Sequence, residues 1–431
     1  MSIVQPSHIL GMNARIQQYT AQNDSTAKQL GFSKLRTKTF LKKHNIPVPE
    51  LYAVISSREE LRAFDWSSIK SAFAVKPASG SAGKGILVIK RKLKNQSVWA
   101  DIEGNEYSAQ DLSLHVADIL EGQYTTWGTQ HKALIEERIG IHPDLEPYVE
   151  VGTPDIRVIL LNNIPVMAMA RLPTEESEGR ANLDLGAIAV GIDFGTGRST
   201  YGVSGKKKTI KFFPRDNVPV GGIEIPYWKQ VLKTAVRVAN ATGYKYLGVD
   251  IFVDPERGPV VAEVNGFPGL SIQLANRAGL RRRLERLRDV EARNVNHAVK
   301  IAQALFAENY PSQTFSDLDL MILSPIEPVT VYGDNENEVS INGLMNTGRT
   351  RSVINLEVAK ELGLFEPEDT LWKQAVGEEG KLPFVEVKYK IRDKVFTTTM
   401  GVSKHLGSRQ WDIELGRKDL KGFLVGGEER T

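Results

Sequence analysis

One segment, GVDIFVDPERGPVVAEVNGFPG at residues 248–269, limits most narrowly what this chain can fold into. Two apolar runs flank the turn-forming sequence Pro-Glu-Arg-Gly, and this pattern predicts a β-hairpin. With residues 255–258 as the turn, Asp250 stands directly opposite Glu263, and Asn265 follows two residues later on the same face of its strand. The pattern therefore predicts a cluster of oxygen-bearing side chains inside an apolar hairpin.

Two carboxylates directly opposed across a strand pair repel each other, and burying them without a partner is costly or shifts their pKa. A divalent cation resolves this conflict because it brings two positive charges to oxygen ligands. Oxygen ligands with no His or Cys nearby favour Mg²⁺ or Mn²⁺, and Mg²⁺ completes its shell with water and phosphate oxygens. We therefore predict that Asp250, Glu263 and Asn265 hold a metal ion that binds a nucleotide. An ordinary edge hairpin with one solvated face is the alternative.

Composition excludes several classes of protein. A chain of 431 residues predicts two or three domains. The net charge of +3 gives no field that would favour nucleic acid or an anionic membrane as a partner. No cysteine is present, so disulfides, thiolate metal sites and cysteine nucleophiles are excluded. No signal peptide and no membrane span are predicted. These features favour a cytoplasmic protein.

A second part of the predicted site is the small-residue loop in KPASGSAGKGI, between strands predicted at residues 72–75 and 86–90. Gly80, Gly83, Lys84 and Gly85 would let backbone N–H groups approach phosphate oxygens closely. The loop is not a Walker A motif, because no helix follows it. It therefore predicts a flap over phosphates, with Lys76 on the preceding strand as a fixed positive charge. A plain mobile hairpin tip is the alternative.

Further polar residues surround these parts. Glu136 and Glu137 end a strand in LIEERI and could accept hydrogen bonds from an adenine amine or from ribose hydroxyls. Arginine donates two parallel hydrogen bonds to a carboxylate or a phosphate. Arg157, Arg171, Arg180 and Asn182 offer such donors on a hairpin and the loop after it. A solvated strand end and surface salt bridges are the alternatives.

The remaining pattern sets the predicted domains. Helices are predicted over residues 11–44, 108–122, 227–242 and 271–308, and a hairpin with an Asn162-Asn163 turn over residues 154–173. Pro, Ser and Asp interrupt the pattern after residue 308, and mostly short strands follow, with one helix at residues 356–362. We predict a first domain over residues 1–310, with a helical part at 1–50, a linker at 311–325 and a second domain at 326–431.

The order of these motifs resembles the ATP-grasp superfamily, and within it the group related to alpha-L-glutamate ligases. The similarity covers about residues 11–305, and VDIFVD…VVAEVN and DIRV are its most specific pieces. It implies two α+β lobes that clamp ATP. Lys38 and Lys76 match the family's nucleotide-phosphate lysines, and Glu136 and Glu137 flank the adenine and ribose. The arginines and Asn182 match contacts to the triphosphate and the acyl phosphate, and the hairpin oxygens match the Mg²⁺ ligands.

The C-terminal part resembles the retropepsin-like fold over about residues 326–428, from its x-Thr-Gly turn between apolar strands and its later Leu-Gly-Arg. At the position of the catalytic Asp, however, the chain has Asn346. Aspartic peptidases need two carboxylates that share one proton, and a domain of this size supplies one half of such a site. We therefore predict no peptidase activity, and a role in binding peptide or forming a homodimer. A generic small β-barrel is the alternative.

These features together predict an α+β protein that is an ATP- and Mg²⁺-dependent carboxylate–amine ligase. A carboxylate would attack the γ-phosphate of ATP, and an amine would displace phosphate from the acyl phosphate to give an amide. The acid and amine would be an amino acid such as glutamate and a peptide, protein tail or small carboxylate. Two alternatives stay open: an ATP-binding scaffold with an inactive peptidase-like domain, and an active peptidase, which Asn346 disfavours.

Overall fold

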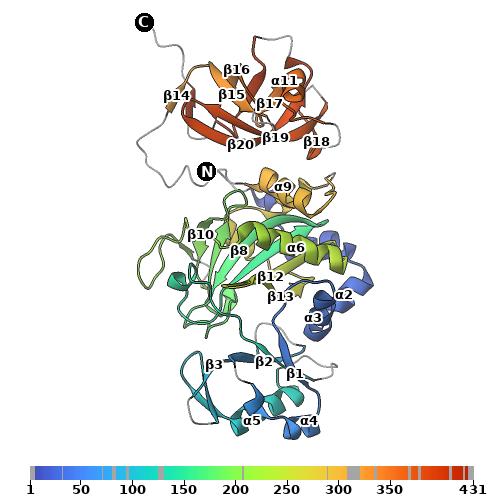
Figure 1. Ribbon diagram of the computed structural model, residues 1–431, viewed down its shortest axis with the longest axis vertical. Helices are drawn as coiled ribbons and strands as arrows, with labels where there is room; N and C mark the ends of the chain where they lie inside the picture. The colour runs from blue at the N-terminus through green and yellow to red at the C-terminus, as the bar shows by residue number, and fades with distance from the viewer. Residues whose placement is uncertain are drawn as a thin grey trace. The chain divides into compact units, whose positions relative to one another are not determined.

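Two units, Met1–Glu285 and Arg286–Thr431, make up the chain in the computed structural model (Figure 1). The structure describes residues 5–31, 33–69, 71–79, 84–93, 97–124, 131–205, 208–288, 290–307, 321–333, 337–366, 370–376, 380–406, 410–420 and 423–425. The first unit ends earlier than the predicted first domain, because residues 286–307 belong to the second unit. Within that second unit, Lys418 Nζ donates to the carbonyl oxygen of Ala304 at 2.9 Å. The linker at residues 311–325 stays a prediction.

Short helices open the first unit, in the region where the sequence predicts helix. They are η1 (Pro6–His8), α1 (Met12–Ala14), η2 (Arg15–Tyr19), η3 (Thr20–Gln22), α2 (Ser25–Gly31) and α3 (Lys34–Lys43). Ser33 begins α3 because its hydroxyl accepts from the backbone N–H of Arg36 at 3.3 Å. Helix α3 buries Thr37, Lys38 and Leu41, which places one lysine inside the unit.

Six antiparallel strands form the first sheet, in the order β1-β6-β2-β3-β4-β5. Their bounds are β1 Leu51–Ile55, β2 Phe73–Pro77, β3 Leu87–Lys92, β4 Val98–Asp101, β5 Glu106–Ser108 and β6 Ala133–Glu137. Helices α4 (Arg58–Ala63), η4 (Trp66–Ser68) and α5 (Ala109–Leu120) accompany the sheet. Helix α5 carries Leu112, Val116 and Ile119 on one stripe, and these residues belong to the core that also contains Phe73 and Ile135 of the sheet. The sheet therefore has one face covered by helix.

Seven antiparallel strands form the second sheet, in the order β11-β10-β9-β8-β7-β12-β13. Their bounds are β7 Asp155–Leu161, β8 Ile164–Leu172, β9 Ile188–Ile192, β10 Ser199–Val203, β11 Thr209–Ile210, β12 Tyr246–Asp254 and β13 Gly258–Asn265. The hairpin turn predicted at Asn162-Asn163 is confirmed, because both residues have positive φ, 49° and 65°. Helix η5 (Glu146–Tyr148) precedes β7 in the chain, and η6 (Leu183–Leu185) and α6 (Trp228–Thr242) lie between strands of this sheet in the chain.

The hairpin β12–β13 has the predicted pairing of Asp250 with Glu263, but its turn and register differ from the prediction. Asp254 pairs with Gly258, so the turn has three residues rather than four, and the positive φ of Gly258 (73°) suits this turn. A register shift between Asp250 and Ile251 then adds one residue to β13. Asp250 therefore stands opposite Glu263, as predicted.

The helical region predicted over residues 271–308 contains breaks that the sequence did not indicate. Three helices occupy this region: α7 (Ile272–Asn276), α8 (Leu280–Glu285) and α9 (Val295–Phe306). Arg277 takes a left-handed conformation with φ 45° and ends α7. Asn294 begins α9 by accepting from the backbone N–H of His297 at 2.9 Å. The apolar periodicity runs through these breaks and did not reveal them.

Strands dominate the second unit. They are β14 Met321–Leu323, β15 Ile326–Tyr332, β16 Glu338–Asn346, β17 Val353–Asn355, β18 Trp372–Ala375, β19 Lys381–Ile391, β20 Lys394–Ser403, β21 Ile413–Gly416 and β22 Phe423–Val425, with helix α11 at Leu356–Glu361. Seven of them form one sheet, β15-β16-β21-β17-β20-β19-β18, and an added pairing of β15 with β19 closes it into a barrel. Val331, Val387, Met400 and Ile413 lie in its core. No helix in the described part of the chain is both long and apolar enough to cross a membrane.

Candidate active site

A cavity of about 890 Å³ lies within the first unit. Its walls come from α2 and α3, from both sheets and from the loop that carries Arg180 and Asn182. The predicted site residues that line it are Lys38, Lys76, Gly85, Glu136, Glu137, Arg157, Arg171, Arg180, Asn182, Asp250, Glu263 and Asn265. Residues predicted from separate motifs therefore meet in one space.

Charged side chains form a row across four neighbouring strands of the second sheet. Asp155 of β7 pairs with Arg171 of β8, because a register shift between Ile159 and Leu160 moves the pairing by one residue. Two residues along β7, Arg157 pairs with Asp250 of β12, and Asp250 pairs on its other side with Glu263 of β13. Directly opposite residues on antiparallel strands lie close enough for their side chains to interact. The sheet thereby places positive and negative groups side by side.

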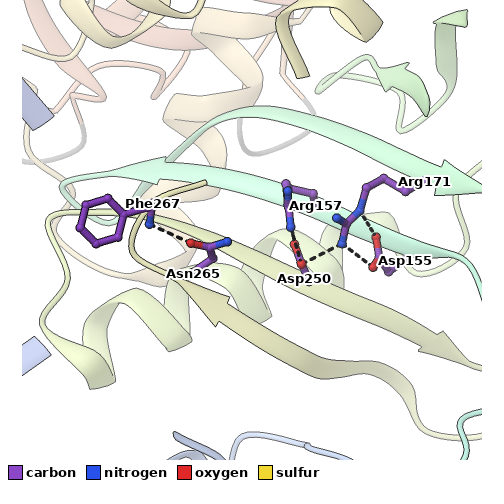
Figure 2. A network of polar contacts seen from close by, with 6 residues as sticks. All are labelled: Asp155, Arg157, Arg171, Asp250, Asn265 and Phe267. Atoms are coloured by element: carbon purple, nitrogen blue, oxygen red, sulfur yellow. Dashed lines mark hydrogen bonds and ion pairs between the residues drawn. The ribbon is translucent and has the colours of Figure 1, made fainter. Parts of the chain in front are cut away.

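The two arginines hold Asp250 from both of its carboxylate oxygens (Figure 2). Arg157 donates from Nε to Oδ1 at 2.7 Å and from Nη2 to Oδ2 at 2.6 Å. Arg171 donates from Nη2 to the same Oδ2 at 2.7 Å, and also grips Asp155 through Nε at 2.6 Å and Nη2 at 2.5 Å. Such charge-assisted, bidentate pairs fix the position of both partners.

These contacts push the pKa values of the two acids in opposite directions. Burial raises the pKa of Asp250, but the charges of Arg157 and Arg171 outweigh it and lower the pKa to about 2. Asp155 is also buried, and burial together with the nearby charge of Asp250 raises its pKa to about 6 against the pull of Arg171. Both acids accept from Arg171, so the protonation of either one affects the other.

The metal was predicted because Asp250 would otherwise be a buried acid without a partner, but arginines of the protein already pair with it. Asp250 is 3% exposed, but two guanidinium groups neutralise it, and Glu263 is exposed. Asn265 Oδ1 accepts from the backbone N–H of Phe267 at 2.8 Å. Among the described residues, no group of three or more His, Cys, Asp and Glu could hold a metal ion.

The donor set still fits a hard cation that shares its shell with a ligand. Mg²⁺ needs one or two carboxylates from the protein and takes its other ligands from water and phosphate. Asp250 and Glu263, with Asn265 two residues on, offer such oxygens at the cavity wall. A metal that binds Asp250 must compete with the arginines, because they already occupy both oxygens.

Two lysines meet one buried carboxylate on the first sheet. Lys38 of α3 and Lys76 of β2 both form ion pairs with Glu136 of β6, which is 1% exposed. Burial raises the pKa of Glu136, and the charges of Lys76 and Lys38 outweigh it, so its pKa is lowered. Burial lowers the pKa of Lys38 to about 8, although Glu136 opposes the change. This trio carries one net positive charge when both lysines are protonated.

Other predicted residues make contacts of their own. Glu137 accepts from the backbone N–H of Glu50 at 3.0 Å and from Arg257 Nη2 at 2.7 Å. Arg180 forms an ion pair with Glu178 and donates from Nε to the carbonyl oxygen of Ser177 at 3.3 Å. Asn182 Oδ1 accepts from the backbone N–H of Asp184 at 3.0 Å and begins η6.

The structure describes only part of the predicted flap. Gly80 and Gly83 lie outside the described residues. Lys84 is exposed and is not among the residues that line the cavity. Gly85 lines it with φ 71°, and an added Cβ there would meet the ring of Tyr124 at 2.4 Å. Only glycine fits at this point.

Several charged residues of the cavity wall were not predicted from the sequence, and Asp155 and Arg138 are two of them. Asp155 binds Arg171, and its signal is the spacing of two from Arg157, which puts both on one face of β7. Arg138 also lines the cavity, and its signal is the spacing of two from Glu136.

In the second unit, Asn346 is bound by its own neighbours. Its Oδ1 accepts from the backbone N–H groups of Gly348 at 3.0 Å and Arg349 at 3.1 Å, and its Nδ2 donates to Glu414 Oε2 at 3.1 Å. Glu414 is fully buried and also binds Arg349 Nε at 3.0 Å and Trp411 Nε1 at 3.1 Å. The amide therefore acts as a structural link between β16 and β21.

The model of one protein family, described as sugar-transfer associated ATP-grasp, matches residues 14–289. This match, which spans the first unit almost completely, confirms the predicted superfamily and its mixed α/β fold. The match ends at residue 289, so it does not bear on whether the C-terminal barrel is retropepsin-like.

Curated relatives cover the same region. The chain is 24% identical over 251 residues to the alpha-aminoadipate–LysW ligase LysX of Sulfolobus acidocaldarius, which covers 58% of this chain and 66% of that protein. It is 26% identical over 235 residues to a protein of Aliivibrio salmonicida named "Probable alpha-L-glutamate ligase", with 52% and 60% covered. The chain thus spans less than two thirds of the length of these relatives. A D-alanine–D-alanine ligase structure from Bacillus anthracis is 13% identical with a TM-score of 0.35, and 65% and 70% of the two chains are covered.

Proposed function

Since the chain belongs to the sugar-transfer associated ATP-grasp family, we propose that it is an ATP- and Mg²⁺-dependent carboxylate–amine ligase. The observation that carries the proposal is the pair of charged clusters in one cavity. Lys38 and Lys76 on Glu136 come from one side, and the row of Arg171, Arg157 and Asp250 comes from the second sheet. A polyphosphate and a reacting carboxylate need such fixed positive groups.

The proposed reaction has two steps. A substrate carboxylate oxygen attacks the γ-phosphorus of ATP, the bond to the β–γ bridging oxygen breaks, and ADP leaves. The amine nitrogen of the second substrate then attacks the acyl carbon, inorganic phosphate leaves, and the nitrogen loses a proton to water. Both steps depend on positioning and charge neutralisation and need no protein nucleophile.

Each group of residues has a proposed role in these two reaction steps. Lys38 and Lys76 bind nucleotide phosphates, and Glu136 holds the two lysines in place. Arg157, Arg171 and Arg180, with Asn182, face the transferred phosphoryl group and the acyl phosphate. Asp250, Glu263 and Asn265 would hold Mg²⁺, or Mn²⁺ in its place, and a bound metal neutralises phosphate charge. Glu137 and the flap glycines Gly80, Gly83 and Gly85, with Lys84, complete the nucleotide site.

The names of the relatives suggest the substrate class. Ligases named for alpha-aminoadipate and LysW, and for glutamate, act on amino acids or on a protein partner. We therefore propose that an amino acid is joined to a peptide, a protein tail or a small carboxylate. A cytoplasmic location and the absence of a nucleic-acid partner stay predictions.

For the second unit we propose a retropepsin-like barrel without peptidase activity, which binds peptide or forms a homodimer. The contacts of Asn346 support the loss of activity, because an amide stands at this position and the Glu414 carboxylate beside it is buried and bound by Asn346, Arg349 and Trp411. A scaffold that binds ATP without turnover is the second candidate function, and the same residue favours it.

Calorimetry with Mg·ATP, followed by an assay of ADP release with candidate acids and amines, tests the proposal. We expect ATP binding, and ADP release that depends on both an acid and an amine. ATP binding without amine-dependent ADP release would favour the scaffold, and absence of ATP binding would exclude both. Lys76→Ala should weaken ATP binding far more than acceptor binding, and equal weakening of both would remove Lys76 from the phosphate site.

A further inference from the structure

Arg138 is a partly buried cation of the cavity that has no partner among the described residues. Its guanidinium makes no ion pair or hydrogen bond there, and its Nε is buried without an acceptor. By contrast, Arg157 and Arg171 are held by Asp250 and Asp155, and Arg180 by Glu178. Arg138 thus differs from every other arginine that lines the cavity.

The local structure keeps this side chain on the cavity wall. Arg138 follows β6 directly, and its backbone N–H donates to the carbonyl oxygen of Ala72 at 3.2 Å, which extends the ladder between β6 and β2. Side chains two apart on an extended strand share a face. Arg138 therefore follows Leu134 and Glu136, and all three line the cavity.

A partly buried charge without a partner is unfavourable in the ligand-free protein. Burial lowers the pKa of Arg138, and no carboxylate of the described residues offsets this effect. Arginine nevertheless stays charged under all ordinary conditions, so the charge cannot be relieved by deprotonation. A ligand that brings an anion into the cavity would neutralise this charge, and this explains why an unpaired arginine lies on the cavity wall.

We infer that Arg138 binds an oxyanion of a ligand in this cavity, either a phosphate of the nucleotide or the carboxylate of an acidic amino-acid substrate. The guanidinium presents a planar fork of donors, which matches both kinds of oxyanion. The trio of Lys38, Lys76 and Glu136 is a separate positive group, so Arg138 adds a further contact to the same ligand set. The ligand identities rest on the proposed ligase function.

The test compares Arg138→Met with the wild-type protein by calorimetry, with adenosine, ADP and AMPPNP as nucleotide probes and L-glutamate and L-2-aminoadipate as acid probes. Methionine keeps much of the apolar length and removes the charge. Arg36→Met is the matched control, because Arg36 is exposed on α3 and does not line the cavity. Arg138→Lys keeps the charge without the fork, and we expect it to bind with intermediate affinity.

We expect Arg138→Met to weaken binding of one oxyanion class about 10- to 100-fold, as for a hydrogen bond to a charged group. Weaker binding of ADP and AMPPNP, with unchanged binding of adenosine, identifies a nucleotide phosphate as the partner. Weaker acid binding with unchanged nucleotides identifies the substrate carboxylate. Unchanged binding of all probes overturns the inference, and so does equal weakening of adenosine and ADP, which indicates stacking on the base.

A second readout needs no turnover. Ligand-free Arg138→Met should resist urea at least as well as the wild type, because it loses an unpaired charge, and the oxyanion probe whose binding is weakened should stabilise it less than it stabilises the wild type. Lower stability without ligand would show that Arg138 has a structural partner and would also overturn the inference. If the wild-type protein binds no nucleotide at all, the proposed function fails instead, and the acid probes alone decide the role of Arg138.

Discussion

Arg171 donates to Asp250 across 2.7 Å although their strands, β8 and β12, are not neighbours. Strand β7 lies between them and supplies Asp155, which holds Arg171, and Arg157, which holds Asp250. The four groups form a neutral set in which each carboxylate accepts from at least one bidentate arginine (Figure 2). This arrangement leads to the first two predictions.

Replacing Arg171 should destabilise the fold. Arg171→Met leaves the buried carboxylates of Asp155 and Asp250 with less compensation, and we expect the free energy of unfolding to fall by about 3 kcal/mol, as for other buried pairs that lose one partner. Urea unfolding measures the change. The double variant Asp155→Leu with Arg171→Met should recover part of the loss, because no buried charge is left unpaired there. A single-variant cost below about 0.5 kcal/mol would contradict the prediction.

Removing Arg157 should strengthen metal binding in the absence of nucleotide. A carboxylate has about four lone-pair sites, and the arginines fill three of them on Asp250. Arg157→Met frees two, so we expect Mn²⁺ to bind about tenfold more tightly than to the wild type, while ligase turnover is lost. Electron paramagnetic resonance of free Mn²⁺ gives the affinity, and Arg36→Met is the control. Equal Mn²⁺ affinity in the variant and the wild type would argue against Asp250 as a metal ligand.

Nucleotide affinity should fall as pH rises through about 8. Burial lowers the pKa of Lys38 to about 8 from 10.5, so Lys38 is charged below this pH and neutral above it. We expect ADP affinity to drop up to about tenfold between pH 7.5 and 9.5, because a neutral amine attracts phosphate poorly. Calorimetry at several pH values checks this. The step should vanish in Lys38→Met, and its persistence there would assign it to another group.

Lys38 should also make the free energy of unfolding rise with pH, whereas it makes nucleotide affinity fall. The folded pKa is lower than the unfolded one, so the unfolded chain binds more protons between pH 8 and 10.5. The contribution of Lys38 to the free energy of unfolding therefore rises over this window and is lost as pH falls through 8. Comparing urea unfolding of the wild type with Lys38→Met at pH 7.5 and 9.5 isolates this contribution. A constant difference between the two proteins would exclude a lowered pKa.

Glu263→Gln should separate catalysis from folding. Glu263 is exposed, so its loss should change the free energy of unfolding by less than about 0.5 kcal/mol. Turnover should be abolished, because one ligand charge of the proposed metal site is lost. ADP release with acid and amine present, together with urea unfolding, measures both effects. Full turnover in this variant would remove Glu263 from the metal site.

Asn346→Asp should not create a peptidase. The new carboxylate would lie at hydrogen-bonding distance from buried Glu414, where the Asn346 amide now donates at 3.1 Å. Two acids so close cannot both be ionised without cost, so we expect lower stability of the barrel and no cleavage of a peptide library. Cleavage by the wild-type protein, lost on Asn346→Ala, would instead support an active peptidase.

The sequence by itself determined the local elements and the supply of chemical groups. The pair Asn162-Asn163 between two apolar runs predicted the hairpin and its turn, because this pattern depends on neighbours in the chain. The motifs likewise supplied many residues that line the cavity, although not Asp155 or Arg138. The sequence did not locate the breaks at Arg277 and Asn294, since the apolar period continues across them.

Only the tertiary structure decided which charges meet. A register shift in β7–β8 sets Asp155 against Arg171, and another in β12–β13 sets Asp250 against Glu263 after a turn that is one residue shorter than predicted. A shift of one residue moves every side chain to the opposite face of a strand, and its position depends on packing between strands that are distant in sequence. For this reason the sequence predicted a metal between two acids, while the structure pairs Asp250 with two arginines and leaves Arg138 without a partner among the described residues.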